Sequence, residues 1–180
     1  MIRQPFKVRS IIATAFLAEP GGFKTWTRSY GRELTLDRDE PARKSFRVGK
    51  THRYVEVTSN GAVSVRGASS IAGARRSMCQ VARLFSRGNA VKLKRFRILN
   101  IVATAELGKP LDLERIFVQT PEPWLSFEPE IFPGLIVRFP GRASIALVFS
   151  SGRVVITGAR SLTQVAASVR DLGAFVSRSR

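Results

Sequence analysis

The chain contains 180 residues, 44% of them hydrophobic and 12 of them phenylalanine, so it can bury a core, and disorder is excluded as its main description. Its 30 lysines and arginines outnumber 13 acidic residues, and the net charge of +17 favours a polyanionic partner, nucleic acid first and an anionic membrane surface second. The single cysteine, Cys79, excludes an intramolecular disulfide and fits a reducing compartment. No apolar run approaches the roughly 18 residues of a membrane-spanning helix, which excludes an integral membrane protein.

The first expected element is a strand that begins near Phe6 and includes the apolar run Ile11–Ala18. Because this run follows Arg3, it is also compatible with a weak secretory signal. Further along, Ser59-Asn60-Gly61 is an Asn-Gly hairpin turn between two strands. An amphipathic helix then ends the first half of the chain. Its expected inward residues are Ile71, Ala74, Met78, Val81, Ala82 and Phe85.

The densest positive cluster, residues 92–97, lies close to the middle of the chain. A solvated linker between two halves and a functional surface explain such a run equally well. The charge differs between the halves, since residues 1–90 contain 17 Lys and Arg with 6 acids, whereas residues 91–180 contain 13 with 7. The positive excess is therefore larger in the first half.

The second half repeats the same order of elements. Expected strands cover residues 97–107, 135–139, 143–149 and 153–157, the last two joined by the tight turn Ser150-Ser151-Gly152. A short helix with acids in its first turn is expected over Asp112–Gln119. A final amphipathic helix is expected over Ser161–Ser177, with Ser161 as its N-cap. Its expected inward residues are Leu162, Val165, Val169, Leu172, Phe175 and Val176.

An internal repeat explains this agreement. Residues 6–15 align with residues 96–105 at an offset of 90, and residues 61–68 align with residues 152–159 at an offset of 91. Matching segments in one order, differing by a single net insertion, indicate a tandem duplication of about ninety residues, 1–90 and 91–180. Because the N-terminal apolar run recurs inside the chain, we interpret it as a strand, and secretion is not expected.

The expected fold class is α+β. Each repeat gives an antiparallel sheet with helices on one face, and two repeats side by side give one long curved sheet with the helices on its convex face. The other face of the sheet stays open. An open sheet face on a chain of net charge +17 is a candidate surface for nucleic acid.

Three segments of the second half strongly resemble the C-terminal repeat of the TATA-binding protein family. They are residues 100–107, 127–138 and 147–159, with the sequences NIVATAEL, FEPEIFPGLIVR and LVFSSGRVVITGA. The resemblance implies a pseudo-symmetric saddle of two repeats, in agreement with the duplication. It also implies minor-groove binding, in which phenylalanine pairs wedge between base steps, Asn and Thr read groove acceptors, and the preferred site is A·T-rich.

Carried over residue by residue, the resemblance implies a DNA-binding face in the second repeat. Its expected members are Asn100, Val102, Phe132, Leu147, Phe149, Val155 and Thr157, with Arg138 as a phosphate contact. A strand phenylalanine is ordinarily a core residue. Phe132 and Phe149 both lie at strand ends beside turns, however, and this position together with the motif favours wedges.

The first repeat departs from the family pattern. Ser10 stands where the family has Asn, Ile12 replaces Val, and Arg66 stands where Thr is expected. Alignment of Gly61 with Gly152 places Thr58 at the position of the second wedge. It places Glu56 at the position of Leu147 and Ser64 at the position of Val155. The first wedge falls at Pro41 if Arg47 matches Arg138, or else at Phe46. The chain therefore resembles a divergent member, with a weaker kink at one end and phosphate attraction raised by positive charge.

The resemblance also implies protein partners. Glu128, Glu130 and Ile131 match the family loop that binds transcription factor IIB-type proteins. The helix with Arg75, Arg76 and Arg83 either binds further initiation factors or is simply solvated. Catalysis is not expected, because one histidine (His52) and one cysteine cannot form a zinc site and no catalytic motif is present. We expect no cofactor, metal or membrane partner.

These observations predict a DNA-binding general transcription initiation factor that bends promoter DNA in the minor groove and recruits a factor IIB-like protein. Its expected location is the nucleus, or a viral or archaeal transcription compartment. Two alternatives remain open. One is an assembly scaffold of the same fold that has lost specific TATA recognition, and the other is a general basic nucleic-acid binder.

Overall fold

The computed structural model of the chain describes residues 6–17, 34–50, 53–85 and 92–178. The chain forms two compact units. The first unit is Ser10–Leu99, and the second unit combines Met1–Arg9 with Asn100–Arg180. The unit boundaries therefore fall inside two strands, β1 (Phe6–Leu17) and β6 (Leu93–Glu106), and each unit receives part of both strands.

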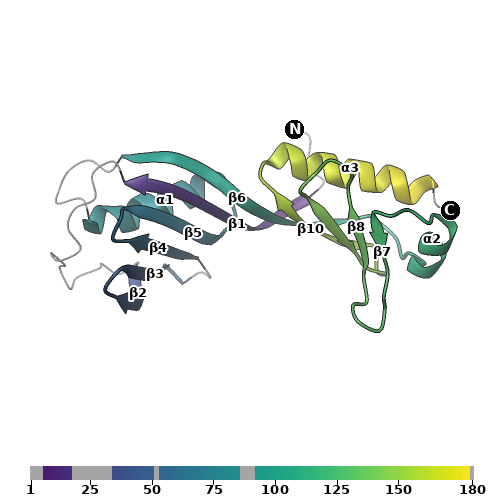
Figure 1. Cartoon of the computed structure of the whole chain (residues 1–180), viewed down its shortest axis with the longest axis horizontal. Coiled ribbons are helices and arrows are strands. Elements are labelled where there is room, and N and C mark those ends of the chain that lie inside the picture. The colour runs from purple at the N-terminus through teal and green to yellow at the C-terminus, as the bar shows by residue number, and fades with distance from the viewer. Residues whose placement is uncertain (1–5, 18–33, 51–52, 86–91, 179–180) are drawn as a thin grey trace. The chain divides into compact units, whose positions relative to one another are not determined.

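The first unit is an antiparallel sheet with a helix on one face (Figure 1). Besides the shared strands it contains β2 (Leu34–Glu40), β3 (Arg43–Val48), β4 (Tyr54–Thr58), β5 (Ala62–Ala68), α1 (Ile71–Ala82) and the short 3-10 helix η1 (Arg83–Phe85). The strand order is β2-β3-β4-β5-β1. Ser70 is the N-cap of α1, and its hydroxyl accepts a hydrogen bond from the Gly73 amide at 3.0 Å. Its apolar stripe packs against β4 and β5.

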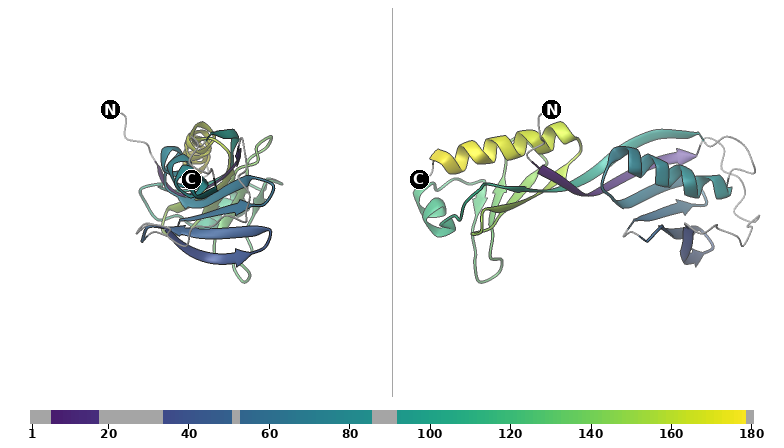
Figure 2. Two further views of the ribbon diagram at one scale, coloured as in Figure 1. Left: turned by 90° about the vertical axis from the view of Figure 1, so that its left-hand side faces the viewer. Right: turned by 180° about the vertical axis from the view of Figure 1, so that it is seen from behind.

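The second unit has a matching plan, with α3 lying along one face of its sheet (Figure 2). Its elements after β6 are α2 (Leu113–Gln119), β7 (Leu125–Ser126), β8 (Leu135–Arg138), β9 (Ile145–Val148), β10 (Arg153–Ala159) and α3 (Leu162–Arg178). The strand order is β6-β10-β9-β8-β7. Ser161 caps α3 as predicted, since its hydroxyl accepts from the Gln164 amide at 3.1 Å.

Both units contain a bulge at corresponding glycines. The pairing of β5 with β1 shifts register near Gly67, and the pairing of β10 with β6 shifts near Gly158. These glycines have φ angles of 83° and 82°, which side-chain-bearing residues rarely adopt. A Cβ on Gly158 would also lie 2.3 Å from the Ala143 carbonyl oxygen. The bulge is therefore a repeated feature of the fold.

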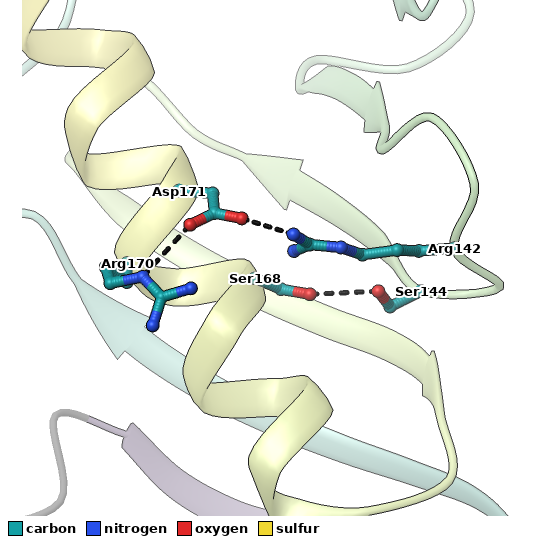
Figure 3. A network of polar contacts seen from close by, with 5 residues as sticks. All are labelled: Arg142, Ser144, Ser168, Arg170 and Asp171. Atoms are coloured by element: carbon teal, nitrogen blue, oxygen red, sulfur yellow. Dashed lines mark hydrogen bonds and ion pairs between the residues drawn. The ribbon is translucent and has the colours of Figure 1, made fainter.

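Helix α3 is fastened to the loop before β9 by polar contacts (Figure 3). Arg142 donates to the Asp171 carboxylate at 2.5 Å, and Arg170 donates to the same carboxylate at 3.1 Å. The Arg142 hydrogen bond is the main cause of the lowered pKa of Asp171. Beneath this exposed cluster, the buried hydroxyls of Ser144 and Ser168 bond to each other at 2.9 Å.

The structure confirms the α+β class, the antiparallel sheet and the helices on one face. It corrects the linker interpretation of the basic cluster, because residues 93–97 belong to strand β6. Arg95 has a φ of 53°, so the strand is irregular there. Strands β2 and β7 were not predicted, since β2 is mostly polar and exposed and β7 has two residues. Among the described residues, no helix combines the length and apolar character needed to cross a membrane.

Candidate nucleic-acid interface

The second unit has one covered sheet face and one open face. In β6, Ile101, Ala103 and Ala105 are buried, whereas Val102 and Thr104 between them are only half-buried. Strand β10 alternates in the same way, because Val154 and Ile156 are fully buried and the residues that follow each of them are half-buried. Successive side chains of a strand point to opposite faces. The half-buried residues therefore lie on the open face, away from α3.

Strand register sets the open-face residues in rows. Val155 of β10 lies opposite both Thr104 of β6 and Leu147 of β9, and Leu147 in turn lies opposite Ile136 of β8. A second row runs from Thr157 through Ile145 to Arg138. Arg138 is exposed at the end of β8. The sequence-predicted residues Leu147, Val155, Thr157 and Arg138 are thus brought together on one surface.

Asn100 is held beside Thr157 by hydrogen bonds that depend on the bulge. Its side-chain oxygen accepts from the Gly158 amide at 2.7 Å, a bond that fixes the orientation of the carboxamide. Its side-chain nitrogen lies 3.4 Å from the Thr157 hydroxyl. The pair presents an amide and a hydroxyl on the open face, two groups that can donate to hydrogen-bond acceptors such as those of the minor groove.

The two predicted wedge residues form a pair. Phe132 precedes β8 and Phe149 follows β9, and their ring centroids lie 5.8 Å apart at an interplanar angle of 64°. Both rings are half-buried. Gly134 makes room for them, because a Cβ at this position would lie 2.7 Å from Cε1 of Phe132. The pair is an apolar, partly exposed projection in the row next to the one that contains Leu147.

The predicted partner loop lies next to the phenylalanine pair. Ile131 and Phe132 donate their backbone amides to the Glu128 carbonyl oxygen at 2.9 and 2.8 Å, which forms a compact turn. Glu128 and Glu130 are exposed, and Ile131 is 80% exposed. An exposed isoleucine flanked by carboxylates is a surface suited to a protein partner with apolar and basic groups.

The first unit has the same rows with different side chains. Arg47, Tyr54 and Arg66 occupy directly paired positions on β3, β4 and β5, and the Arg66 guanidinium lies 5.6 Å from the centre of the Tyr54 ring. The neighbouring row consists of Ser45, Glu56, Ser64 and Thr14. Ser10 and Ile12 are half-buried on β1. The mostly apolar row of the second unit is thus a polar row in the first.

An ion-pair cluster occupies the place of the phenylalanine pair. Arg43 lies opposite Thr58, and its guanidinium lies 3.6 Å from Glu40 and 3.7 Å from Glu56. Pro41 lies in the turn between β2 and β3. The alternative assignment of Phe46 as a wedge is wrong. Phe46 is fully buried and packs edge-on against the Phe85 ring, with centroids 6.2 Å apart.

Sequence reasoning missed several open-face residues: Thr104, Ile136, Tyr54 and Thr14. The period-two alternation that placed Val155 and Thr157 together also applies to Thr104 and Ile136, and that signal was sufficient to find them. Groups of three or more His, Cys, Asp or Glu side chains able to hold a metal ion do not occur in the described ranges. His52 lies outside the described residues.

Comparison with known proteins identifies relatives. Residues 95–178 match the family model described as "Transcription factor TFIID (or TATA-binding protein, TBP)". The chain is 36% identical over 121 residues to TATA box-binding protein-like 2 of Rattus norvegicus, which covers 67% of this chain and 35% of that protein. It is 33% identical over 107 residues to the TATA-box-binding protein of Archaeoglobus fulgidus, covering 58% of each chain. The chain therefore spans between about a third and three fifths of these relatives.

A solved structure shares the fold over nearly the whole chain. The Methanococcus jannaschii TBP structure superimposes with a TM-score of 0.77, covering 97% of this chain and 99% of that chain at 22% sequence identity. At this identity the likeness establishes the fold. It extends over both units, whereas the family model matches the second half.

Proposed function

We propose that this chain, which belongs to the TATA-binding protein family, is a DNA-binding transcription initiation factor whose second unit binds A·T-rich promoter DNA in the minor groove. The observation that carries the proposal is the Phe132–Phe149 pair at the end of an open, partly apolar sheet face. At the other side of this face lies the Asn100–Thr157 pair. Proteins that bind and bend DNA through the minor groove frequently combine an apolar wedge with polar groups that read the groove.

The mechanism follows from where these groups lie. Phe132 and Phe149 would enter a base step and unstack it, at a cost of a few kcal/mol that is smallest at flexible TA steps. Val155 and Leu147 would pack against the exposed sugar and base edges. Asn100 and Thr157 would donate to the acceptors of the groove floor, where the exocyclic amine of guanine would clash. Arg138 would contact a backbone phosphate.

The first unit attracts DNA electrostatically but lacks an aromatic wedge pair. Pro41 and Thr58 do not form an aromatic pair, so we expect the kink at this end of the site to be weaker or absent. Arg66 and Arg47 lie on the open face and would contact phosphates or groove edges, together with Ser10 and Ile12. Binding by this unit is then strongly salt-dependent and weakly sequence-dependent.

Gel-shift titrations on a TATA duplex and a scrambled duplex, at two salt concentrations, test DNA recognition. Phe149→Ala is expected to lower the TATA preference about tenfold, because a specific groove contact is worth about 1–3 kcal/mol. Val118→Ala, which changes a 69%-exposed apolar side chain on α2, is the matched control. Equal wild-type affinity for both duplexes, unchanged in Phe149→Ala, would refute specific recognition.

We further propose that Glu128, Glu130 and Ile131 bind a transcription factor IIB-like protein through its basic and apolar groups. The support is their joint exposure on one turn beside the wedge pair. Glu130→Arg should abolish complex formation with such a factor and leave DNA affinity intact. Glu114→Arg, the same charge reversal on the exposed first turn of α2, should change neither. Loss of both activities in Glu130→Arg would contradict separate surfaces.

A second candidate is a scaffold of this fold, or a general basic nucleic-acid binder, without TATA recognition. The ion pairs of Arg43 with Glu40 and Glu56 favour it, because they replace a wedge by a surface that prefers water. In that case α1, whose Arg75 guanidinium stacks 3.9 Å from the Phe96 ring centre, is a further partner surface together with Arg76 and Arg83. For either candidate, we propose that the protein is not an enzyme and that it acts in the nucleus, or in a viral or archaeal transcription compartment.

A further inference from the structure

A cation from the start of the chain lies on the open face of the second unit. The Nε of Arg9 donates to the Thr104 hydroxyl at 2.9 Å, although 95 positions separate the two residues. Arg9 belongs to the second unit, which it enters as the last residue of its N-terminal segment. The contact therefore lies inside one unit and adds a side chain that neither the repeat nor the family motif indicates.

Thr104 places this cation among the groove-facing groups. Thr104 lies directly opposite Val155, and two residues further back along β6 is Val102. Both valines lie on the open face, between the Asn100–Thr157 pair and the phenylalanine pair. A guanidinium bound to the Thr104 hydroxyl consequently lies beside the row that contains Thr104, Val155 and Leu147, within the predicted groove-binding surface.

The guanidinium has donors left to offer. Its Nε is used by Thr104, while the two terminal nitrogens carry further N–H groups in a planar fork. Arg9 is exposed, and within the described part of the chain it makes no ion pair with a carboxylate. Among the described residues, no carboxylate therefore neutralises its charge, and the hydrogen bond to Thr104 orients the guanidinium.

We propose that Arg9 is a specificity-determining residue, which reads the minor-groove edge of an A·T base pair near the centre of the second unit's binding site. The inference rests on the proposed function, since it needs DNA on this face. A·T and T·A pairs expose only acceptors in the minor groove, and two N–H groups of one guanidinium match them. A G·C pair places the guanine amine, itself a donor, in the same position and repels the fork. The negative potential of A·T-rich grooves further favours an inserted arginine.

The test uses full-length protein and a scan of 2,6-diaminopurine for adenine, one position at a time, across a TATA duplex. This base keeps Watson–Crick pairing with thymine and adds an amine to the minor groove. For the wild type we expect a loss of about tenfold at each base pair that the protein reads there. For Arg9→Ala we expect sensitivity to vanish at one or two central positions and to remain elsewhere.

Lys7→Ala is the matched control, because Lys7 is an exposed cation two residues away on the same strand and in the same unit. It should weaken binding to all duplexes alike, as loss of a non-specific charge does. Thr104→Val keeps the shape of the side chain and removes the acceptor. It should reduce the central sensitivity without changing the net charge.

The outcomes separate this inference from the function on which it rests. A wild type that is insensitive at every position refutes minor-groove reading altogether, and with it the role of Arg9. A sensitive wild type whose profile is unchanged in Arg9→Ala, or whose Arg9→Ala and Lys7→Ala variants weaken all duplexes equally, overturns the role of Arg9 alone. Selective loss at central positions in Arg9→Ala supports it.

Discussion

The two units have the same covered sheet face and different open faces. Val65 and Ile156 occupy corresponding buried positions, and both lie beneath a helix. On the opposite side, the Phe132–Phe149 pair of the second unit corresponds to an ion-pair cluster around Arg43 in the first. Because strand side chains alternate between faces, one face can be replaced without disturbing the other. The core and the open surface are therefore encoded by different residues of the same strands.

The strongest test of this separation removes a buried side chain from each unit. Ile156→Ala should destabilise the protein by about 2–5 kcal/mol, because it leaves a cavity in a fully buried site. Val65→Ala should cost less, since fewer methyl groups are lost. Both losses are measured as the change in the free energy of unfolding in urea. A negligible effect in one unit would contradict equivalent cores.

Gly134→Arg introduces an arginine at the position that corresponds to Arg43 of the first unit. The new Cβ would collide with the Phe132 ring and lie 3.1 Å from the Val148 carbonyl oxygen. We expect about 1–3 kcal/mol of destabilisation from overpacking and a loss of DNA bending, measured by urea unfolding and by energy transfer between labelled duplex ends. A stable variant that still bends DNA would show that the phenylalanine pair is not the wedge. Gly173→Arg, on a helix position with open space at Cβ, is the control.

Removing charge from the open face of the first unit should have a smaller effect. Arg66→Ala should lower the slope of log affinity against log salt concentration by about 0.9, the value for one phosphate contact, with equal losses on TATA and scrambled duplexes. Arg76→Ala removes the same charge from α1 and should leave the slope unchanged. A loss confined to the TATA duplex would mean that Arg66 reads bases.

The smallest expected effect is on the pH dependence of stability, through Asp171 of α3. Arg142 and Arg170 hold the pKa of Asp171 below its ordinary value of 3.8. A carboxylate with a lowered pKa stabilises the folded state at pH values above its unfolded pKa, and this contribution disappears as the pH falls through the folded pKa. Asp171→Asn should therefore be slightly less stable than the wild type at neutral pH and equal to it in acid. A difference that persists in acid would exclude the ion pair as its source.

Local patterns predicted most of the second unit. The alternation in β10, the capping serine of α3 and the strand-end positions of Phe132 and Phe149 are all short-range signals, and the structure contains each of them. The DNA-contacting roles of the predicted residues stay predictions, as does the division of the chain into repeats 1–90 and 91–180.

The errors arose where distant residues decide the outcome. Phe46 was a wedge candidate because its sequence position allowed it, but its ring fits against Phe85 on a different element. The basic cluster was compatible with a linker because its lysines and arginines interrupt the alternation of apolar and polar residues that is typical of a strand. Pairing within the sheet nevertheless makes it part of β6. The Arg9–Thr104 contact joins residues from opposite halves and leaves no periodic trace.

The passage of β1 and β6 from one unit into the other has a genetic consequence. A gene fragment that ends at the predicted boundary between residues 90 and 91 would encode neither compact unit completely. Each unit contains a strand segment from the other half of the sequence.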